Sequence, residues 1–282
     1  LHTNDPAWGA HDNDGHGTQM AGLALYGDLT EPMASNAPFT VEHRLESVKL
    51  LPHSNVNQGE PFGELTAEAV GRPEVTAPDR RRVFSMAITT TDNRDRGRPS
   101  AWSAAIDSLA CDVLGEGLTP RLIVVSAGNL DDLNAWRDYP NSNITEGIHD
   151  PGQSWNALTV GAYTQKINIT EHDAQAYQPI ALADSLSPFS TTSVTWHKTP
   201  WPYKPDVVFE GGNAARDAIS PATMPSLSLL STHHQLTQRL LTTSNATSAA
   251  SALCSRMAAQ IMVEYPNLWP ETVRALIVHS AV

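Results

Sequence analysis

Short runs of β-branched and apolar residues alternate with longer segments of helical pattern along this chain, and that alternation limits the folds it can adopt. Strands are predicted at residues 45–51, 83–88, 122–126, 158–161 and 207–209, and helices at 16–26, 100–114, 248–265 and 271–280. Strands and helices in alternation are typical of a parallel sheet covered on both faces. The predicted fold class is therefore α/β, with three layers, a mainly parallel central sheet and helices on both of its faces.

The lengths of the segments favour one domain rather than several. At 282 residues the chain can bury a substantial core, and a single domain over residues 1–282 is expected. Residues 52–79 are polar and carry several prolines and glycines, which predicts a loop with at most a short helix near 65–70. Residues 211–244 form a longer segment than an ordinary connection, so we expect this segment to be functional or mobile.

Composition argues against two classes of partner. The formal net charge of −12 argues against binding to a nucleic-acid backbone, and the basic run at 80–82 is too short to change that. The sequence has no run of about 18 apolar residues, so no membrane-spanning segment is expected. Cys111 and Cys254 both fall in predicted helices with apolar neighbours, which favours buried thiols and a reducing, cytoplasmic compartment.

A histidine lies between two glycines at the start of the first predicted helix. His16 follows Gly15 and precedes Gly17, so the backbone around its ring is open. An imidazole titrates near a pKa of about 6.5 and can accept a proton and later return it, as general-base catalysis requires. For a histidine taken alone, a helix cap or a packed turn residue is the stronger interpretation.

Two further motifs carry groups that would complement such a base. Ser248 begins a helix of small residues, where unpaired N–H groups and the helix dipole favour negative charge. Asn129 ends an apolar strand and offers a side-chain amide that can donate to an oxyanion. Taken singly, Thr247 or Ser248 fits a helix N-cap and Asn129 fits a turn.

In their order along the chain, these segments are similar to the histidine, asparagine and serine blocks of the subtilases, the subtilisin-like serine endopeptidases. The similarity is carried by residues 16–22, 123–129 and 246–252, and by weaker family signals at 157–162, 188–190, 204–208 and 273–277. Each segment alone is a weak signal, whereas the ordered set is specific. Two residues depart from the family pattern, Ala246 where the family has glycine and Ala252 where it has proline.

The resemblance implies a subtilisin-like fold and a serine endopeptidase that works through an acyl-enzyme. Ser248 would be the nucleophile, His16 its base and Asn129 the oxyanion donor. The substrate would lie as an extended peptide between two walls, formed by Ala87, Ile88 and Thr89 and by Ser126, Ala127 and Gly128. A cleft that binds the substrate through its main chain predicts broad specificity. The expected partners are a protein or peptide substrate and a regulatory protein.

The family's triad also needs an aspartate, which comes from an Asp-Ser/Thr-Gly motif upstream of the histidine. No such tripeptide precedes His16, and Asp5, Asp12 and Asp14 lie in a predicted loop without a strand to aim them. We therefore expect a fragment truncated at its N-terminus, without the first strand and the aspartate. Alone it should hydrolyse peptides barely or not at all, and the gap in its sheet should destabilise it.

Two other functions remain open on the sequence. One is a catalytically silent peptide-binding or regulatory protein, which predicts that the full-length chain also lacks the aspartate motif. The other is a metal hydrolase, since histidine and carboxylate ligands closely spaced on a loop can chelate zinc, here His11, Asp12, Asp14 and His16. The serine mechanism itself needs no metal or other cofactor. The calcium that many relatives carry cannot be placed from these residues.

Overall fold

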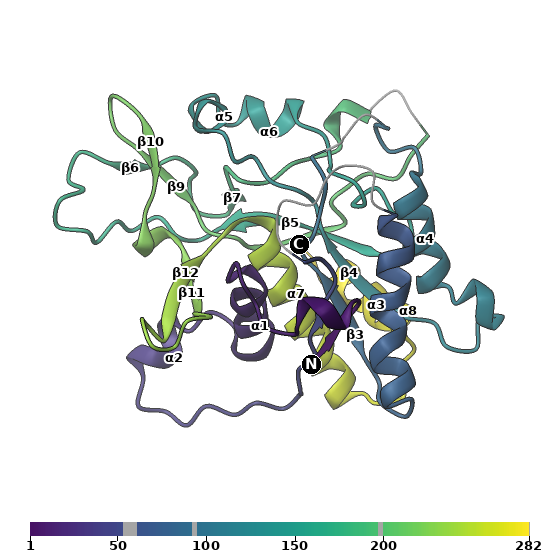
Figure 1. Ribbon diagram of the computed structural model, residues 1–282. Helices are drawn as coiled ribbons and strands as arrows, with labels where there is room; N and C mark the ends of the chain where they lie inside the picture. Colours follow the sequence, from purple (N-terminus) through teal and green to yellow (C-terminus); the bar gives the residue numbers. More distant parts are fainter. Residues whose placement is uncertain (53–60, 92–94, 197–199, 282) are drawn as a thin grey trace.

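The computed structural model describes residues 1–52, 61–91, 95–196 and 200–281, and its centre is a mainly parallel sheet. In these residues the sheet has five strands, ordered β3-β4-β5-β7 with β8 paired to β5 (Figure 1). They are β3 (Val83–Met86), β4 (Leu122–Ser126), β5 (Leu158–Thr164), β7 (Ser185–Leu186) and β8 (Val207–Glu210). All pair in parallel except β7, which is antiparallel to the end of β5. The α/β class predicted from the sequence is confirmed.

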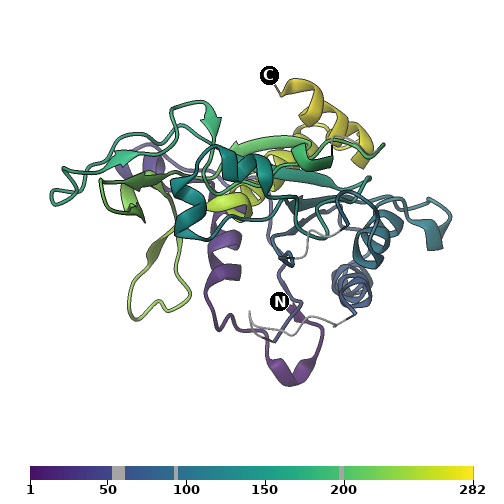
Figure 2. The ribbon, with the colours of Figure 1, turned by 90° about the horizontal axis from the view of Figure 1, so that it is seen from above.

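Helices cover both faces of this sheet, because alternate residues of a strand point to opposite sides. Leu122 and Val124 pack with α7 (Ala246–Glu264) and α8 (Pro270–Ser280), whereas Ile123 and Val125 pack with α4 (Ala101–Ala110). The helix α3 (Phe62–Thr76) lies beside α4, and Figure 2 shows α3 and α8 on opposite sides of the sheet. Every residue of β4 is buried, as a strand between two helical layers requires.

The central helix α7 approaches the sheet through small side chains. Ala250, Cys254 and Ala258 follow one another at intervals of four residues, so they lie on one face, and none of them exposes any surface. Burial raises the pKa of the Cys254 thiol to about 12, as expected for an inert core cysteine. The buried thiol expected at Cys111 is wrong: α4 ends at Ala110, and Cys111 lies just beyond it, exposed.

Two predicted segments near the N-terminus differ clearly from the structure. The segment 52–79, predicted mainly as a loop, contains the 15-residue helix α3 in its described part, and residues 53–60 lie outside the described residues. Glycines and Pro73 hide this helix from a pattern search, while its buried face packs it into place. The strand predicted at 45–51 is only β2 (Val48–Lys49), which pairs in parallel with β1 (His2–Thr3) apart from the central sheet.

The long segment 211–244 is ordered as antiparallel ribbons beside the central sheet. Its strands are β9 (Ala214–Arg216), β10 (Pro221–Thr223), β11 (Leu229–Thr232) and β12 (Leu241–Ser244), and β9 also pairs with β6 (Gln178–Pro179). In Figure 1 they lie on the side of the molecule away from α3 and α4. The remaining helices are α1 (His16–Tyr26), α2 (Thr30–Ala34), α5 (Leu133–Arg137) and α6 (Asn141–Thr145).

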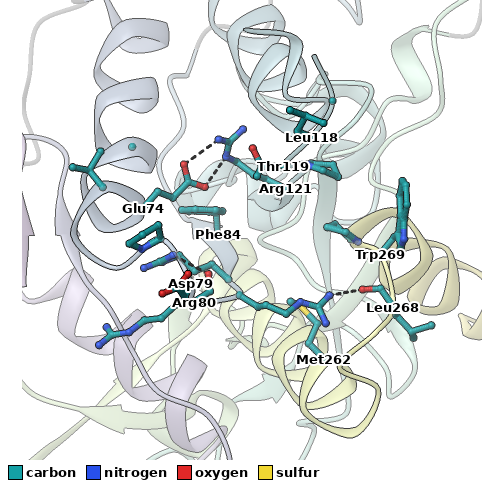
Figure 3. A pocket seen from close by; sticks show the side chains of 18 of the residues that line it. Glu74, Asp79, Arg80, Phe84, Leu118, Thr119, Arg121, Met262, Leu268 and Trp269 are labelled. Carbon is teal, nitrogen blue, oxygen red and sulfur yellow. Dashed lines mark hydrogen bonds and ion pairs between the residues drawn. The ribbon is translucent and has the colours of Figure 1, made fainter. Parts of the chain in front are cut away.

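A pocket of ≈ 790 Å³ opens at the amino ends of β3 and β4 (Figure 3). Its walls come from the end of α3, from the residues that lead into the two strands, and from the link between α7 and α8. The predicted catalytic and substrate-binding residues do not line it, since Ala87–Thr89 and Ser126–Asn129 follow the carboxyl ends of the same strands. We place the candidate site at that carboxyl edge because the chemical groups lie there.

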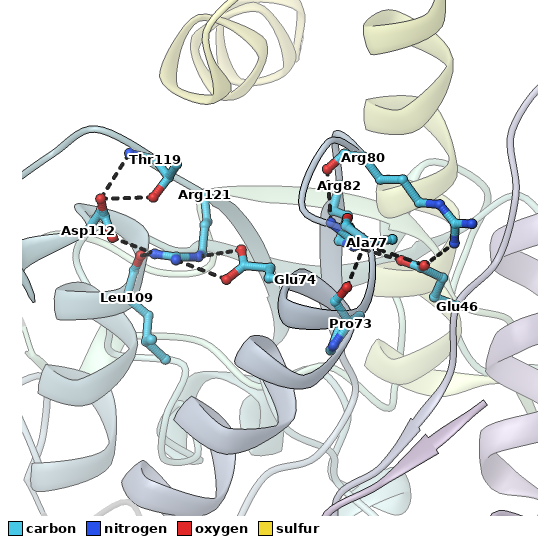
Figure 4. A network of polar contacts seen from close by, with 10 residues as sticks. All are labelled: Glu46, Pro73, Glu74, Ala77, Arg80, Arg82, Leu109, Asp112, Thr119 and Arg121. Carbon is cyan, nitrogen blue, oxygen red and sulfur yellow. Dashed lines mark hydrogen bonds and ion pairs between the residues drawn. The ribbon is translucent and has the colours of Figure 1, made fainter. Parts of the chain in front are cut away.

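Two arginine-centred networks fix the opposite, amino end of the sheet (Figure 4). Arg121, just before β4, donates to both carboxylate oxygens of Glu74 on α3 at 2.7 and 3.0 Å, and to Asp112 at 3.0 Å. Arg82, just before β3, donates to Glu46 at 2.6 Å and to the carbonyl oxygens of Pro73 and Ala77 at 2.8 Å each. These bonds hold the end of α3 against the two strands despite the proline within the helix.

Among the described residues, no helix combines the length and the apolar character that a bilayer crossing requires.

Candidate functional site

The predicted nucleophile, Ser248, is the third residue of α7 and lies at the carboxyl edge of the central sheet. The strand β12 runs directly into this helix through Asn245. Ser248 is 7% exposed, and its hydroxyl forms no hydrogen bond with another described residue. Free N–H groups at a helix N-terminus favour the negative charge that an attack by this hydroxyl would create, and the role of Ser248 as nucleophile stays a prediction.

The turn before Ser248 contains a residue in the left-handed backbone conformation. Ala246 has φ of 69°, a region that glycine enters freely and alanine enters at a cost of roughly 1–2 kcal/mol. Its N–H donates to Gly211 at 2.7 Å, and its methyl group is buried with Trp136 and Phe189. Alanine therefore stands at a turn whose backbone suits the glycine of the family pattern, and surrounding contacts maintain that turn.

The predicted oxyanion donor, Asn129, is bonded directly to the residue before Ser248. Its Oδ1 accepts the backbone N–H of Thr247 at 3.1 Å and the Thr247 hydroxyl at 2.6 Å. Because a backbone N–H can only donate, the acceptor must be Oδ1, so the carboxamide orientation is determined and Nδ2 is left as a donor. Thr247 is fully buried, and its hydroxyl also lies 3.2 Å from the Gly128 carbonyl oxygen.

Gly128 allows a histidine to lie against the loop that carries Asn129. Gly128 has φ of 102°, and a Cβ at this position would collide with the His149 side chain. The N–H of His149 donates to the Ala127 carbonyl at 2.9 Å, and His149 is 8% exposed. Burial lowers the pKa of His149, so the ring is neutral at neutral pH. His149 could not be identified from sequence, since nothing in its local pattern marks it as a site residue.

The predicted base, His16, is the first residue of α1 and follows Gly15, whose φ is 89°. The Asp12 carboxylate accepts from the Gly15 N–H at 2.9 Å and from the N–H and hydroxyl of Thr18 at 2.7 Å each. Asp12 therefore caps α1 with both oxygens instead of bonding to the imidazole. His16 is exposed, yet the protein around its ring desolvates it and lowers its pKa, more than the Asp12 charge raises it. The neutral form, which a general base needs, is thus favoured.

The helix that carries His16 packs against the helix that carries Ser248. Met20 and Leu23 of α1 share a cluster with Ala249 and Ala252 of α7. His16 lies one turn before Met20, so both are on the face of α1 that is turned toward α7. The described structure shows no hydrogen bond between His16 and Ser248, and their pairing stays a prediction.

The two predicted walls of the substrate cleft follow adjacent parallel strands. Ile88 and Thr89, just after β3, make no backbone hydrogen bond to another described residue, which leaves their main chain available to a peptide. Ala127 differs: its N–H donates to Val160 at 3.0 Å and its carbonyl accepts from His149. At Ala127 the second wall can therefore offer a surface for contact, but its main-chain groups are not free to pair with a peptide. Binding of a substrate by either wall stays a prediction.

The histidines and aspartates before α1 do not assemble a metal site. Among the described residues, no group of three or more histidine, cysteine, aspartate or glutamate side chains is arranged to hold an ion. His11, Asp12, Asp14 and His16 all belong to the described residues, and Asp12 is engaged by Gly15 and Thr18. The metal-hydrolase hypothesis therefore gains no support from the geometry.

Known structures share this architecture. Sphericase superposes with a TM-score of 0.57 at 19% identity, covering 95% of this chain and 70% of that one. The S41 psychrophilic protease gives 0.55 at 19% identity with the same coverages, and the prenylagaramide maturation protease PagA gives 0.53 at 14%, covering 95% and 72%. At such identities the likeness shows the fold alone, and it confirms the subtilisin-like fold.

Sequence comparisons give the family. The uncharacterized protein y4bN of Sinorhizobium fredii is 27% identical over 222 residues, which cover 73% of this chain and 47% of that protein. The chain thus spans about half the length of the curated relative it matches. The family model Peptidase_S8, described as the subtilase family, matches residues 2–282. The chain belongs to the subtilase family of serine peptidases.

Proposed function

We propose that this chain is the catalytic part of a serine endopeptidase, with Ser248 as nucleophile, His16 as general base and Asn129 as oxyanion donor. The observation that carries the proposal is the pair of bonds from Thr247 to the Asn129 Oδ1, at 3.1 and 2.6 Å. They orient the amide donor beside the turn that presents Ser248. The packing of α1 on α7, with the His16 face toward α7, supports the role of the base.

The chemistry follows from these groups. As the Ser248 hydroxyl attacks a peptide carbonyl carbon, its proton passes to the neutral imidazole of His16. The carbonyl oxygen becomes an oxyanion, and the Asn129 amide stabilises the growing charge. His16 then returns the proton to the leaving amine, and the acyl-enzyme forms. Water repeats the sequence on the ester and releases Ser248.

The orienting aspartate is proposed to lie upstream of Leu1. Asp12 is occupied in capping α1, so it does not orient the imidazole. The sheet is also divided: β1 and β2 form a separate parallel pair, and β3 is the edge of the central sheet. A parallel strand between β2 and β3 would pair both edges. This division supports the proposal of a missing strand that ends in the aspartate.

Labelling by a fluorophosphonate tests the proposal, since such a probe phosphonylates an activated serine. The 282-residue chain and a chain that carries its upstream segment would be compared near neutral pH, and the labelled peptide identified by mass spectrometry. We expect labelling at Ser248 in the longer chain, loss in Ser248→Ala and retention in the matched control Ser244→Ala. Labelling at another serine would contradict the role of Ser248, and an unlabelled longer chain without an aspartate motif would favour the catalytically silent protein.

Peptide hydrolysis tests the aspartate separately. Its loss costs about 10⁴-fold in turnover in the serine-protease examples, subtilisin included, and this magnitude is borrowed from them. We therefore expect the 282-residue chain to hydrolyse casein barely or not at all and the longer chain to hydrolyse it. Efficient hydrolysis by the shorter chain would contradict the missing aspartate.

The remaining expectations concern partners and location. We propose protein or peptide substrates, a regulatory partner protein, and action in the cytoplasm. Cell fractionation with an antibody to this chain would test the location, and recovery outside the cytoplasm would contradict it.

A further inference from the structure

The hairpin formed by β11 and β12, residues 229–244, is bonded to the helix that carries the predicted base. The Ser231 hydroxyl donates to the carbonyl oxygen of Gln19 at 2.6 Å, and the Thr232 hydroxyl donates to that of Thr18 at 2.8 Å. Both acceptors belong to the first turn of α1, close to His16. A carbonyl oxygen has two lone pairs, so each can accept a hydroxyl in addition to its helical bond.

A glycine in α1 leaves the space that these two hydroxyls occupy. A Cβ on Gly22 would collide with the hydroxyl oxygens of both Ser231 and Thr232. A second close approach follows at Gly15, where a Cβ would lie 2.6 Å from Nδ1 of His234. Gly15 and Gly22 therefore let one edge of α1 lie directly against the hairpin.

The same hairpin leads into the predicted nucleophile. Ser244, the last residue of β12, pairs with Leu229 of β11, and α7 begins two residues later. Leu229 is fully buried between α1 and α7, in a cluster with Leu23 and Ala249. One hydrogen-bonded ribbon thus contacts α1 near His16 and continues into the turn before Ser248.

We propose that the hairpin sets the relative position of His16 and Ser248, with Ser231 and Thr232 as its positioning residues. This inference rests on the proposed function. The packing of α1 on α7 is made by apolar side chains, among them Met20, Leu23 and Leu253. Because apolar contact is non-directional, it defines the position of α1 along α7 less sharply than a hydrogen bond does. Hydrogen bonds require a donor–acceptor distance and direction, so the two hydroxyls fix the height of α1 along α7.

The test removes the two hydroxyls with little change in shape, in Ser231→Ala, Thr232→Val and the double variant, on the chain that carries its upstream segment. Fluorophosphonate labelling of Ser248 would be resolved into a binding constant, KI, and a maximal rate, kinact. Since a misplacement of about 1 Å can cost about 10²-fold, we expect kinact to fall roughly 10-fold in the double variant. The binding constant should stay within about twofold because neither hydroxyl lies in the predicted walls.

Three controls separate positioning from loss of stability. Thr232→Ser keeps the hydroxyl and should restore kinact. Thr243→Val, which removes an exposed hydroxyl on the same hairpin, should leave kinact unchanged. In a His16→Ala background the double substitution should cause no further fall, since the hydroxyls act through His16. If the double variant does not fold, Thr232→Val alone serves, with a fall in the same direction.

The outcomes distinguish this inference from the proposed function. Labelling that depends on His16 but is unaffected by the loss of both hydroxyls would overturn the inference and leave the proposed function standing. An equal fall of kinact with and without His16 would also overturn it, because the hydroxyls would then act on the fold alone. Absence of Ser248 labelling in the unsubstituted protein would overturn both.

Discussion

The hydrogen bond from the Thr247 hydroxyl to Asn129 is the most informative contact to remove, because its loss should lower both the stability of the fold and the rate at which Ser248 is acylated. The substitution Thr247→Val replaces the hydroxyl by a methyl group of similar size at a fully buried position. It removes the 2.6 Å bond to the Asn129 Oδ1 and the 3.2 Å contact with the Gly128 carbonyl, while the 3.1 Å bond from the Thr247 N–H remains.

Two magnitudes follow from this geometry. A hydrogen bond contributes a net 0.5–1.5 kcal/mol, and a buried acceptor left without any partner costs about 1–3 kcal/mol. Since Oδ1 keeps one donor, we expect the free energy of unfolding to fall by about 1–2 kcal/mol. The carboxamide keeps one of two restraints, so we expect acylation of Ser248 to slow about 10-fold. Complete loss of such a donor in subtilisin, of the same family, costs about 10²–10³-fold, which is the upper limit.

Urea unfolding and fluorophosphonate labelling of the same samples measure the two effects. Thr247→Ser keeps the hydroxyl and should lie close to the unsubstituted protein in acylation. If Thr247→Val loses the expected stability while its acylation rate stays within about twofold, the Thr247 hydroxyl does not orient the Asn129 amide and the prediction is wrong.

Three further predictions concern pH, backbone strain and the amino end of the sheet. Desolvation by the surrounding protein lowers the pKa of the buried His149 and of the His16 ring below the usual value of about 6.5, so the unfolded chain binds more protons. Stability that is present above about pH 6.5 should therefore be lost as the pH falls through the folded pKa values. Urea midpoints across this range would show it, His149→Gln should flatten the dependence, and a flat profile for the unsubstituted protein would contradict it. Ala246→Val places a β-branched residue at φ of 69° in a buried cluster and should lower the free energy of unfolding by roughly 2–4 kcal/mol. Ala246→Gly relieves the backbone strain but loses a buried methyl group, so it should change the free energy of unfolding by less than about 1 kcal/mol. Equal effects of the two variants in urea unfolding would contradict backbone strain at this position. Arg121→Met removes the cation shared by Glu74 and Asp112, although Asp112 keeps its bonds from Thr119, and should cost about 2–4 kcal/mol by the same measurement. Ser248 labelling in the folded protein should stay unchanged because the network lies at the far end of the sheet.

Elements with strong local signals were predictable from sequence. The helix at 16–26 and the strand at 122–126 have the predicted bounds, because glycines flank the helix and an unbroken apolar run marks the strand. The helix at 62–76 is much longer than the short helix expected near 65–70, since its local pattern is interrupted by glycine and proline. Tertiary contacts stabilise it, among them packing against α4 and the bonds from Arg121 and Arg82. Cys111 was misplaced for a similar reason, because the end of α4 decided its exposure.

The sequence by itself determined the subtilase family, the alternation of strands and helices, and the positions of His16, Asn129 and Ser248 at the ends of those elements. These features depend on short motifs and local propensity, which residues close together in the chain establish. Only the tertiary structure decided which partner each group has: Thr247 with Asn129, 118 residues apart, Asp12 with the start of α1, and Ser231 and Thr232 with the carbonyls beside His16. Hydrogen bonds depend on distance and direction in space, and residues far apart in a chain acquire both only when the fold packs them together.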